Sequence, residues 1–193
     1  MQNAISYLVP KNNIIPNGIL GMLFLIATEM MFFGGLISAY IVNRAGVGIW
    51  PPEGQPRLSV EITAFNSALL LISAIMIFFV NKNISVDLKK AKMFLLFSIV
   101  LGISFIAIQG SEWVKLLGFG LTTKSGLYGA FFYTIIGAHA LHAAVGISLL
   151  LYVFLSFKTK SQKEIAATAQ VCSLYWYFVA VIWVPLYYLV YLY

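Results

Sequence analysis

Long apolar runs are the feature that most constrains the fold of this chain. Each of five runs is long enough for a helix that crosses a bilayer, which needs about 20 mostly apolar residues. The expected spans are residues 18–43, 62–81, 93–117, 127–157 and 165–192. Only 9% of the 193 residues are charged, against about 25% in a soluble domain. The sequence therefore predicts an all-α integral membrane protein, a five-transmembrane-helix bundle with a single domain over residues 1–193.

Three details refine this bundle. At a rise of about 1.5 Å per residue, the fourth span is about 45 Å long, so that we expect it to tilt or protrude. Pro185 lies inside the fifth span and should kink that helix, because proline removes a backbone hydrogen bond. The connection 44–61 is rich in proline and glycine, which predicts a non-helical loop.

Basic residues are distributed unevenly between the two sides of the predicted bundle. Eight of the twelve lie on the side of the N-terminus: Lys11, Lys82, Lys89, Lys90, Lys92, Lys158, Lys160 and Lys163. The other four are Arg44, Arg57, Lys115 and Lys124. Because basic loops stay in the cytoplasm, we expect a cytoplasmic N-terminus without a cleavable signal peptide and an external C-terminus. The net charge of +6 then reflects topology and attraction to lipid headgroups, and we expect no nucleic-acid partner.

Ionisable residues at membrane depth are the candidates for function, because they are costly to place there. Glu29 lies near the centre of the first span, and His139 and His142 share a face of the fourth. Glu29 could be a neutral acid bonded inside the bundle, a proton-relay or proton-antenna group, or an anchor for a lipid headgroup reached through water. The histidines could bond to a neighbouring helix, to Glu29 or to a lipid phosphate.

No metal site is expected, because the chain lacks the ligands for one. Two histidines on one face cannot complete a zinc site of three or four ligands, and they cannot ligate a haem iron from both sides of the ring. The single cysteine, Cys172, excludes an internal disulfide and favours a packing role. A second polar cluster, Gln109 and Glu112 followed by Trp113, is typical of the membrane interface. No catalytic residue is predicted.

Small residues indicate where the helices approach closely in lipid. In the fourth span a row with a period of four residues contains one imidazole, and shorter pairs occur in the first and third spans. The row is Gly126, Ala130, Thr134, Ala138, His142 and Gly146, and the pairs are Gly34 with Ser38, Gly35 with Ala39 and Ser98 with Gly102. We expect a close neighbour for the fourth helix.

Several motifs resemble subunit III of the haem-copper oxygen reductases, in order and spacing across nearly the whole chain. They are Thr28-Glu29-Met30-Met31-Phe32-Phe33-Gly34, Trp50-Pro51-Pro52-Glu53-Gly54, Gln109-Gly110-Ser111-Glu112-Trp113, Gly126-Leu127-Tyr128-Gly129, Gly137-x-His139-x-x-His142 and Tyr175-Trp176-x-Phe178 with Trp183. The chain is similar to the short, five-helix bacterial form, without the first two helices of the fuller form. Tyr177 and Ala180 stand where the last helix of the family often has histidine and aspartate.

The resemblance implies an accessory subunit of a proton-pumping terminal oxidase of the cytochrome c oxidase type, in the bacterial inner membrane. Haem and copper would belong to subunit I and other partner subunits, with no redox centre on this chain. The chain would bind phospholipid and support proton uptake and the stability of the catalytic subunit. Glu29, His139 and His142 would form the polar core beside lipid or water, with Gln109 and Glu112 as a second cluster.

Alternative functions remain open from the sequence. Within the family, the chain could be subunit III of a quinol oxidase or an accessory subunit of a nitric oxide reductase. From a different class, it could be an independent small transporter or proton channel that uses Glu29 and the two histidines. Haem absorbance that co-migrates with the purified chain would distinguish an oxidase subunit from a transporter.

Overall fold

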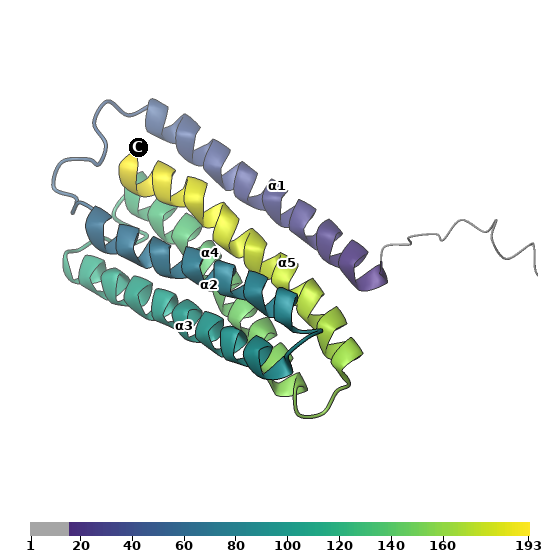
Figure 1. Cartoon of the computed structure of the whole chain (residues 1–193). Coiled ribbons are helices and arrows are strands. Elements are labelled where there is room, and N and C mark those ends of the chain that lie inside the picture. The colour runs from purple at the N-terminus through teal and green to yellow at the C-terminus, as the bar shows by residue number, and fades with distance from the viewer. Residues whose placement is uncertain (1–15) are drawn as a thin grey trace, which may run out of the picture.

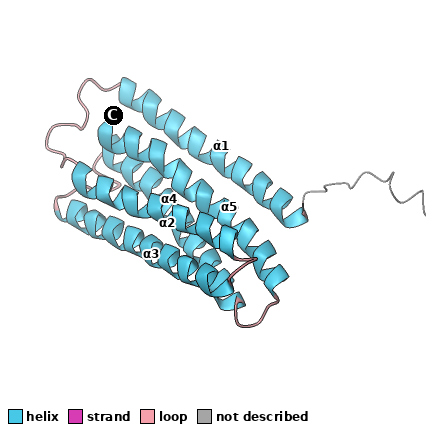
Figure 2. Cartoon of the chain, viewed as in Figure 1, coloured by secondary structure: helices cyan, strands magenta, loops and turns pink. Residues whose placement is uncertain are grey.

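The computed structural model describes residues 16–193 as a bundle of long helices (Figure 1). The helices are α1 (Asn17–Ala45), α2 (Val60–Asn83), α3 (Leu88–Gly118), α4 (Leu127–Ser156) and α5 (Gln162–Tyr187), and a short π-helix, η1 (Tyr188–Leu192), extends α5. No strand occurs between residues 16 and 193 (Figure 2). All five long helices are long and apolar enough to cross a membrane. The predicted five-helix, all-α fold is confirmed. Lys11 and most of the N-terminal residues that bear on the signal-peptide prediction lie outside the described residues.

Helices α3 and α5 begin five and three residues before the apolar runs that predict them, because polar residues cap them. The Asp87 carboxylate accepts hydrogen bonds from the backbone N–H groups of Lys89 (3.0 Å) and Lys90 (3.1 Å), so α3 begins at Leu88. The bond from the Lys90 N–H is the main reason that the pKa of Asp87 is lowered. Ser161 and Glu164 form a capping box at the start of α5. Much of the basic connection 82–92 is therefore helical.

Pro185 does not end the last helix. α5 continues through it to Tyr187, and the backbone then widens into η1, in which the N–H of Tyr193 donates to the carbonyl of Tyr188 at 2.8 Å. Because Pro185 has no N–H to donate to the preceding turn, the regular hydrogen-bond ladder is interrupted close to where the helix widens.

The core is built around Trp176 of α5, which is fully buried. Its indole N–H donates to the Ser73 hydroxyl of α2 at 3.0 Å, and Ser73 is bonded to Ser98 of α3 at 2.9 Å. Gly102 and Gly146 leave room for the ring, since a Cβ at either position would lie within 3.0 Å of it. At Gly146, the small-residue row on α4 thus has α5 as a close neighbour.

Helix α1 lies at the edge of the bundle beside α5 and α4 (Figure 1). Only two of its residues, Phe33 and Tyr40, are buried. A Cβ at Gly34 or Gly35 would meet nothing within 4 Å, so these two glycines do not mediate packing against the other described helices. The connection 46–59 then crosses over the end of the bundle to reach α2 (Figure 1).

Candidate functional site

Glu29 and His142 form a direct contact between α1 and α4. The Oε2 atom of Glu29 lies 2.8 Å from Nε2 of His142. Both side chains are largely shielded, with 25% of the Glu29 side chain and 13% of the His142 side chain exposed. Of the three partners predicted for the histidines, Glu29 is the one that His142 contacts.

The two helices hold this pair in a fixed geometry. On α4, the Nδ1 atom of His142 lies 2.7 Å from the Ala138 carbonyl oxygen, one turn earlier, which fixes the plane of the ring. On α1, Phe33 lies one turn after Glu29 and therefore on the same face. The Phe33 ring is fully buried and packs edge-on against the His142 ring at 5.1 Å between centroids. Phe33 thus docks α1 onto α4 beside the polar contact.

The bonding pattern determines how many protons the Glu29–His142 pair holds. A carbonyl oxygen only accepts hydrogen bonds, so Nδ1 of His142 must carry a proton to bond to Ala138. The bond between Nε2 and Glu29 needs one further proton, either on the carboxyl group or on Nε2. Both arrangements leave the pair with no net charge, which suits a membrane interior. Without this proton, Nε2 of His142 and the Glu29 carboxylate would both be hydrogen-bond acceptors, and the contact between the helices would break.

An apolar groove of about 510 Å³ opens beside the pair. Its walls come from α1, α4 and α5 and are lined by Met22, Leu25, Glu29, Leu141, His142, Val145, Leu149 and Tyr175. The two polar groups therefore lie at the edge of an apolar surface that three helices form.

His139 lies in a different environment, although it shares a helix face with His142. It is 1% exposed, and neither ring nitrogen has a hydrogen-bond partner among the described residues. Aromatic rings surround it: Trp183 at 4.7 Å, Phe105 at 5.9 Å and Phe33 at 6.5 Å between centroids. His139 contacts Phe33 but does not bond to Glu29.

Gln109 and Glu112 belong to a separate region, between α2, α3 and the end of the chain. Gln109 is 3% exposed, donates to the Tyr191 hydroxyl at 2.9 Å and accepts from the Asn66 amide at 3.4 Å. Glu112 is 6% exposed and forms an ion pair with Lys115 at 2.7 Å. Gln109 is thus part of a hydrogen-bond network inside the bundle, and its position near the membrane interface stays a prediction. Asn66 is not predicted from the sequence as a partner of Gln109, although an amide near the start of an apolar run is an available signal.

We expect the purified chain to contain no stoichiometric haem, copper or zinc. Within residues 16–193 no three His, Cys, Asp or Glu side chains are grouped as a metal site. His142 already uses both ring nitrogens, and His139 is enclosed by aromatic rings. Metal analysis of the separated subunit checks this. One metal equivalent that disappears in a His142→Ala variant would contradict the prediction.

Five helices long and apolar enough to span a membrane make this chain a multi-pass integral membrane protein. Its polar core is the shielded Glu29–His142 pair, which lies beside an apolar groove. The chain belongs to the cytochrome c oxidase subunit III family, whose model matches residues 5–193. The resemblance inferred from the motifs is therefore confirmed.

Curated relatives agree with this family. A probable cytochrome c oxidase subunit 3 from Nocardia farcinica is 34% identical over 178 residues, which cover 89% of this chain and 85% of that protein. The cytochrome c oxidase subunit 3 of Synechocystis is 33% identical over 179 residues, covering 89% and 73%. That of Thermostichus vulcanus is 30% identical over 179 residues, covering 90% and 86%.

Proposed function

We propose that this chain is the accessory subunit III of a haem-copper terminal oxidase of the cytochrome c oxidase type, in a bacterial inner membrane. It packs against the catalytic subunit I, binds phospholipid, and supports proton uptake and the endurance of that subunit. The observation that carries the proposal is the Glu29–His142 pair at the edge of the apolar groove between α1, α4 and α5. Membership of the subunit III family supports the oxidase complex.

The chemistry of the pair fits a supporting role. One exchangeable proton links two helices, so protonation and the position of α1 are coupled. α1 is otherwise held by few buried residues, which makes its position sensitive to what fills the groove. A phospholipid acyl chain there would restrain α1 and exclude bulk water from the pair. This role requires no redox centre on the chain.

Purification in mild detergent with a tag on this chain tests the proposal. We expect haem absorbance and the catalytic subunit to co-migrate with the tagged chain, and phospholipid to be recovered in the extract. A harsher detergent should release the chain without haem. A chain that migrates alone in mild detergent, with no haem absorbance in the fraction, would favour the transporter or proton-channel alternative.

The topology is a further expected result. The starts of α1, α3 and α5 lie at one end of the bundle with the connections 84–87 and 157–161, and the end of α5 lies at the other (Figure 1). Seven lysines cluster at the first end, and four basic residues lie at the second. We therefore expect a cytoplasmic N-terminus and an external Tyr193. A periplasm-dependent phosphatase fused after Tyr193 should be active, and a cytoplasm-dependent reporter at the same position should be silent; the reverse pattern would contradict this topology.

A further inference from the structure

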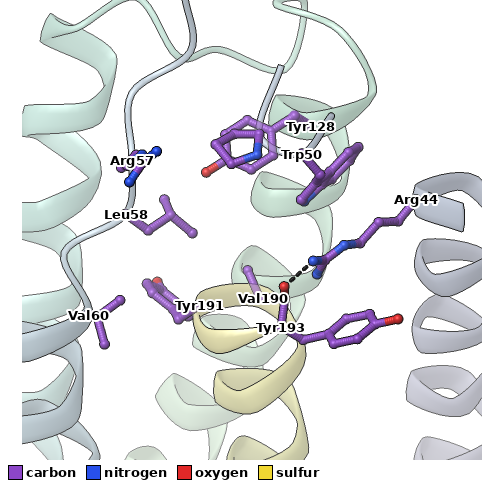
Figure 3. Close-up of a pocket in the computed structure, with 10 residues that line it drawn as sticks. Arg44, Trp50, Arg57, Leu58, Val60, Tyr128, Val190, Tyr191 and Tyr193 are labelled. Atoms are coloured by element: carbon purple, nitrogen blue, oxygen red, sulfur yellow. Dashed lines mark hydrogen bonds between the residues drawn. The ribbon is translucent and has the colours of Figure 1, made fainter. Parts of the chain in front are cut away.

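A second site lies at the end of the bundle where the chain terminates, away from Glu29. A pocket of about 370 Å³ opens between the end of α1, the connection 46–59, the starts of α2 and α4, and η1. Figure 3 shows Arg57 and Leu58 on one side of it, Arg44 on the other, and the end of the chain below. The lining residues are Arg44, Trp50, Pro51, Arg57, Leu58, Val60, Tyr128, Val190, Tyr191 and Tyr193.

The pocket holds the guanidinium groups of Arg44 and Arg57 and is rich in hydrogen-bond donors. None of its lining side chains is acidic. Two contacts with Tyr193 hold the Arg44 side chain in place. Its Nη2 donates to the main-chain oxygen of Tyr193, and its guanidinium lies 4.0 Å from the centre of the Tyr193 ring. Arg57 is exposed and has no ion pair or hydrogen bond from its side chain to the described residues. The buried indole N–H of Trp50 also lacks a partner within residues 16–193.

An apolar groove lies on the outer surface of the bundle between α2 and α5, farther from this end. It measures about 510 Å³ and is lined by Leu71, Ala74, Ile75, Phe78, Tyr177, Ala180 and Val181. Val60 lines the pocket and Leu71 lines the groove. Along the axis of α2 these residues are about 16 Å apart, at 1.5 Å per residue. The exposed residues Val181 and Val184 of α5 and Tyr188 at the start of η1 follow helical spacing away from the groove.

We propose that the pocket and the groove together bind one phospholipid of the leaflet at this end of the bundle. Arg44 and Arg57 bind the phosphodiester, and an acyl chain passes along α5 into the groove between α2 and α5. Guanidinium groups suit phosphate because their planar N–H groups can form paired, charge-assisted bonds. The distance between the two parts fits within one leaflet, which is about 15 Å thick in its hydrocarbon region. This site is distinct from the groove beside Glu29, and it deepens the lipid binding of the proposed function.

The test uses the whole oxidase complex purified through this chain, delipidated and then titrated with palmitoyl-oleoyl phosphatidylglycerol or with inorganic phosphate. Native mass spectrometry counts the lipid retained by the subunit. Arg57→Gln should weaken phosphatidylglycerol binding at this site about tenfold, as expected for the loss of a charge-assisted bond, and remove one lipid per subunit. Lys124→Gln is the matched control, since Lys124 is a basic residue at the same end that does not line the pocket.

The groove variants separate a lipid from free phosphate. Ala74→Phe fills the groove and should weaken phosphatidylglycerol binding while inorganic phosphate still competes at Arg57. Ile72→Phe is its control, because Ile72 is an exposed α2 residue outside the groove. Unchanged retention in Arg57→Gln would overturn the site, and loss in Arg57→Gln with no effect of Ala74→Phe would overturn the lipid assignment. Haem co-migration tests the proposed function separately, because it does not depend on either variant.

Discussion

Replacing Glu29 with alanine should shorten the working life of the oxidase several-fold while its haem spectrum stays unchanged. The change removes the acid from Nε2 of His142 and leaves that nitrogen without its 2.8 Å partner. Loss of one partner of a shielded hydrogen bond costs about 1–3 kcal/mol, which loosens α1 without unfolding the bundle. The exchangeable proton of the pair is lost as well, so that we also expect slower proton uptake. His142→Ala should have the same effect.

Oxygen consumption in matched lipid gives the initial rate and the decay during sustained turnover. Glu29→Gln is the informative companion variant, because its amide can donate to Nε2 of His142 but cannot release a proton at neutral pH. A proton role predicts that Glu29→Gln keeps the stability of α1 and still slows uptake. Glu61→Gln, an exposed acid at the start of α2, is the control. If all variants have wild-type rates and decay, the Glu29–His142 pair contributes only to helix packing. If a variant loses the haem spectrum, the pair is needed for the structure of the complex.

Gly146→Ala should destabilise the subunit by about 1–3 kcal/mol, the usual cost of overpacking a tight core. The new Cβ would lie 2.6 Å from Cε3 and 2.9 Å from Cζ3 of Trp176. The ring cannot move aside easily, because it is fully buried, its N–H is bonded to Ser73, and Gly102 lies close on α3. The added methyl group must therefore push α4 away from α5.

Thermal unfolding of the purified subunit in detergent measures this effect. Gly35→Ala on α1 is the matched control: it makes the same change in a membrane helix, where a Cβ would meet nothing within 4 Å. We expect its midpoint to equal that of the wild type or to rise slightly, since alanine favours helix. Equal midpoints for Gly146→Ala and Gly35→Ala would contradict the packing argument. Gly102→Ala should combine non-additively with Gly146→Ala, because both contact the same ring.

The five helices follow from the sequence because membrane insertion depends on local properties. A run of apolar residues must satisfy its backbone hydrogen bonds within itself, which only a helix does. The helix starts at Leu88 and Gln162 are also locally encoded, by Asp87 and by the Ser161–Glu164 pair. The apolar run predicts a shorter α3, because the cap residue Asp87 lies in the polar segment before that run.

The partners of the polar residues are decided by the tertiary structure. Glu29 and His142 are 113 residues apart, and nothing in either helix fixes which faces meet. His139 and His142 have the same residue type and share a face, yet a bond to Glu29 reaches only His142, because Phe33, Phe105 and Trp183 enclose His139. In lipid there is no apolar driving force to orient a helix, so its rotation is set by close packing and a few polar contacts. Sequence alone therefore determined the spans and the candidate residues, and packing around Trp176 and Phe33 decided which of them contact each other.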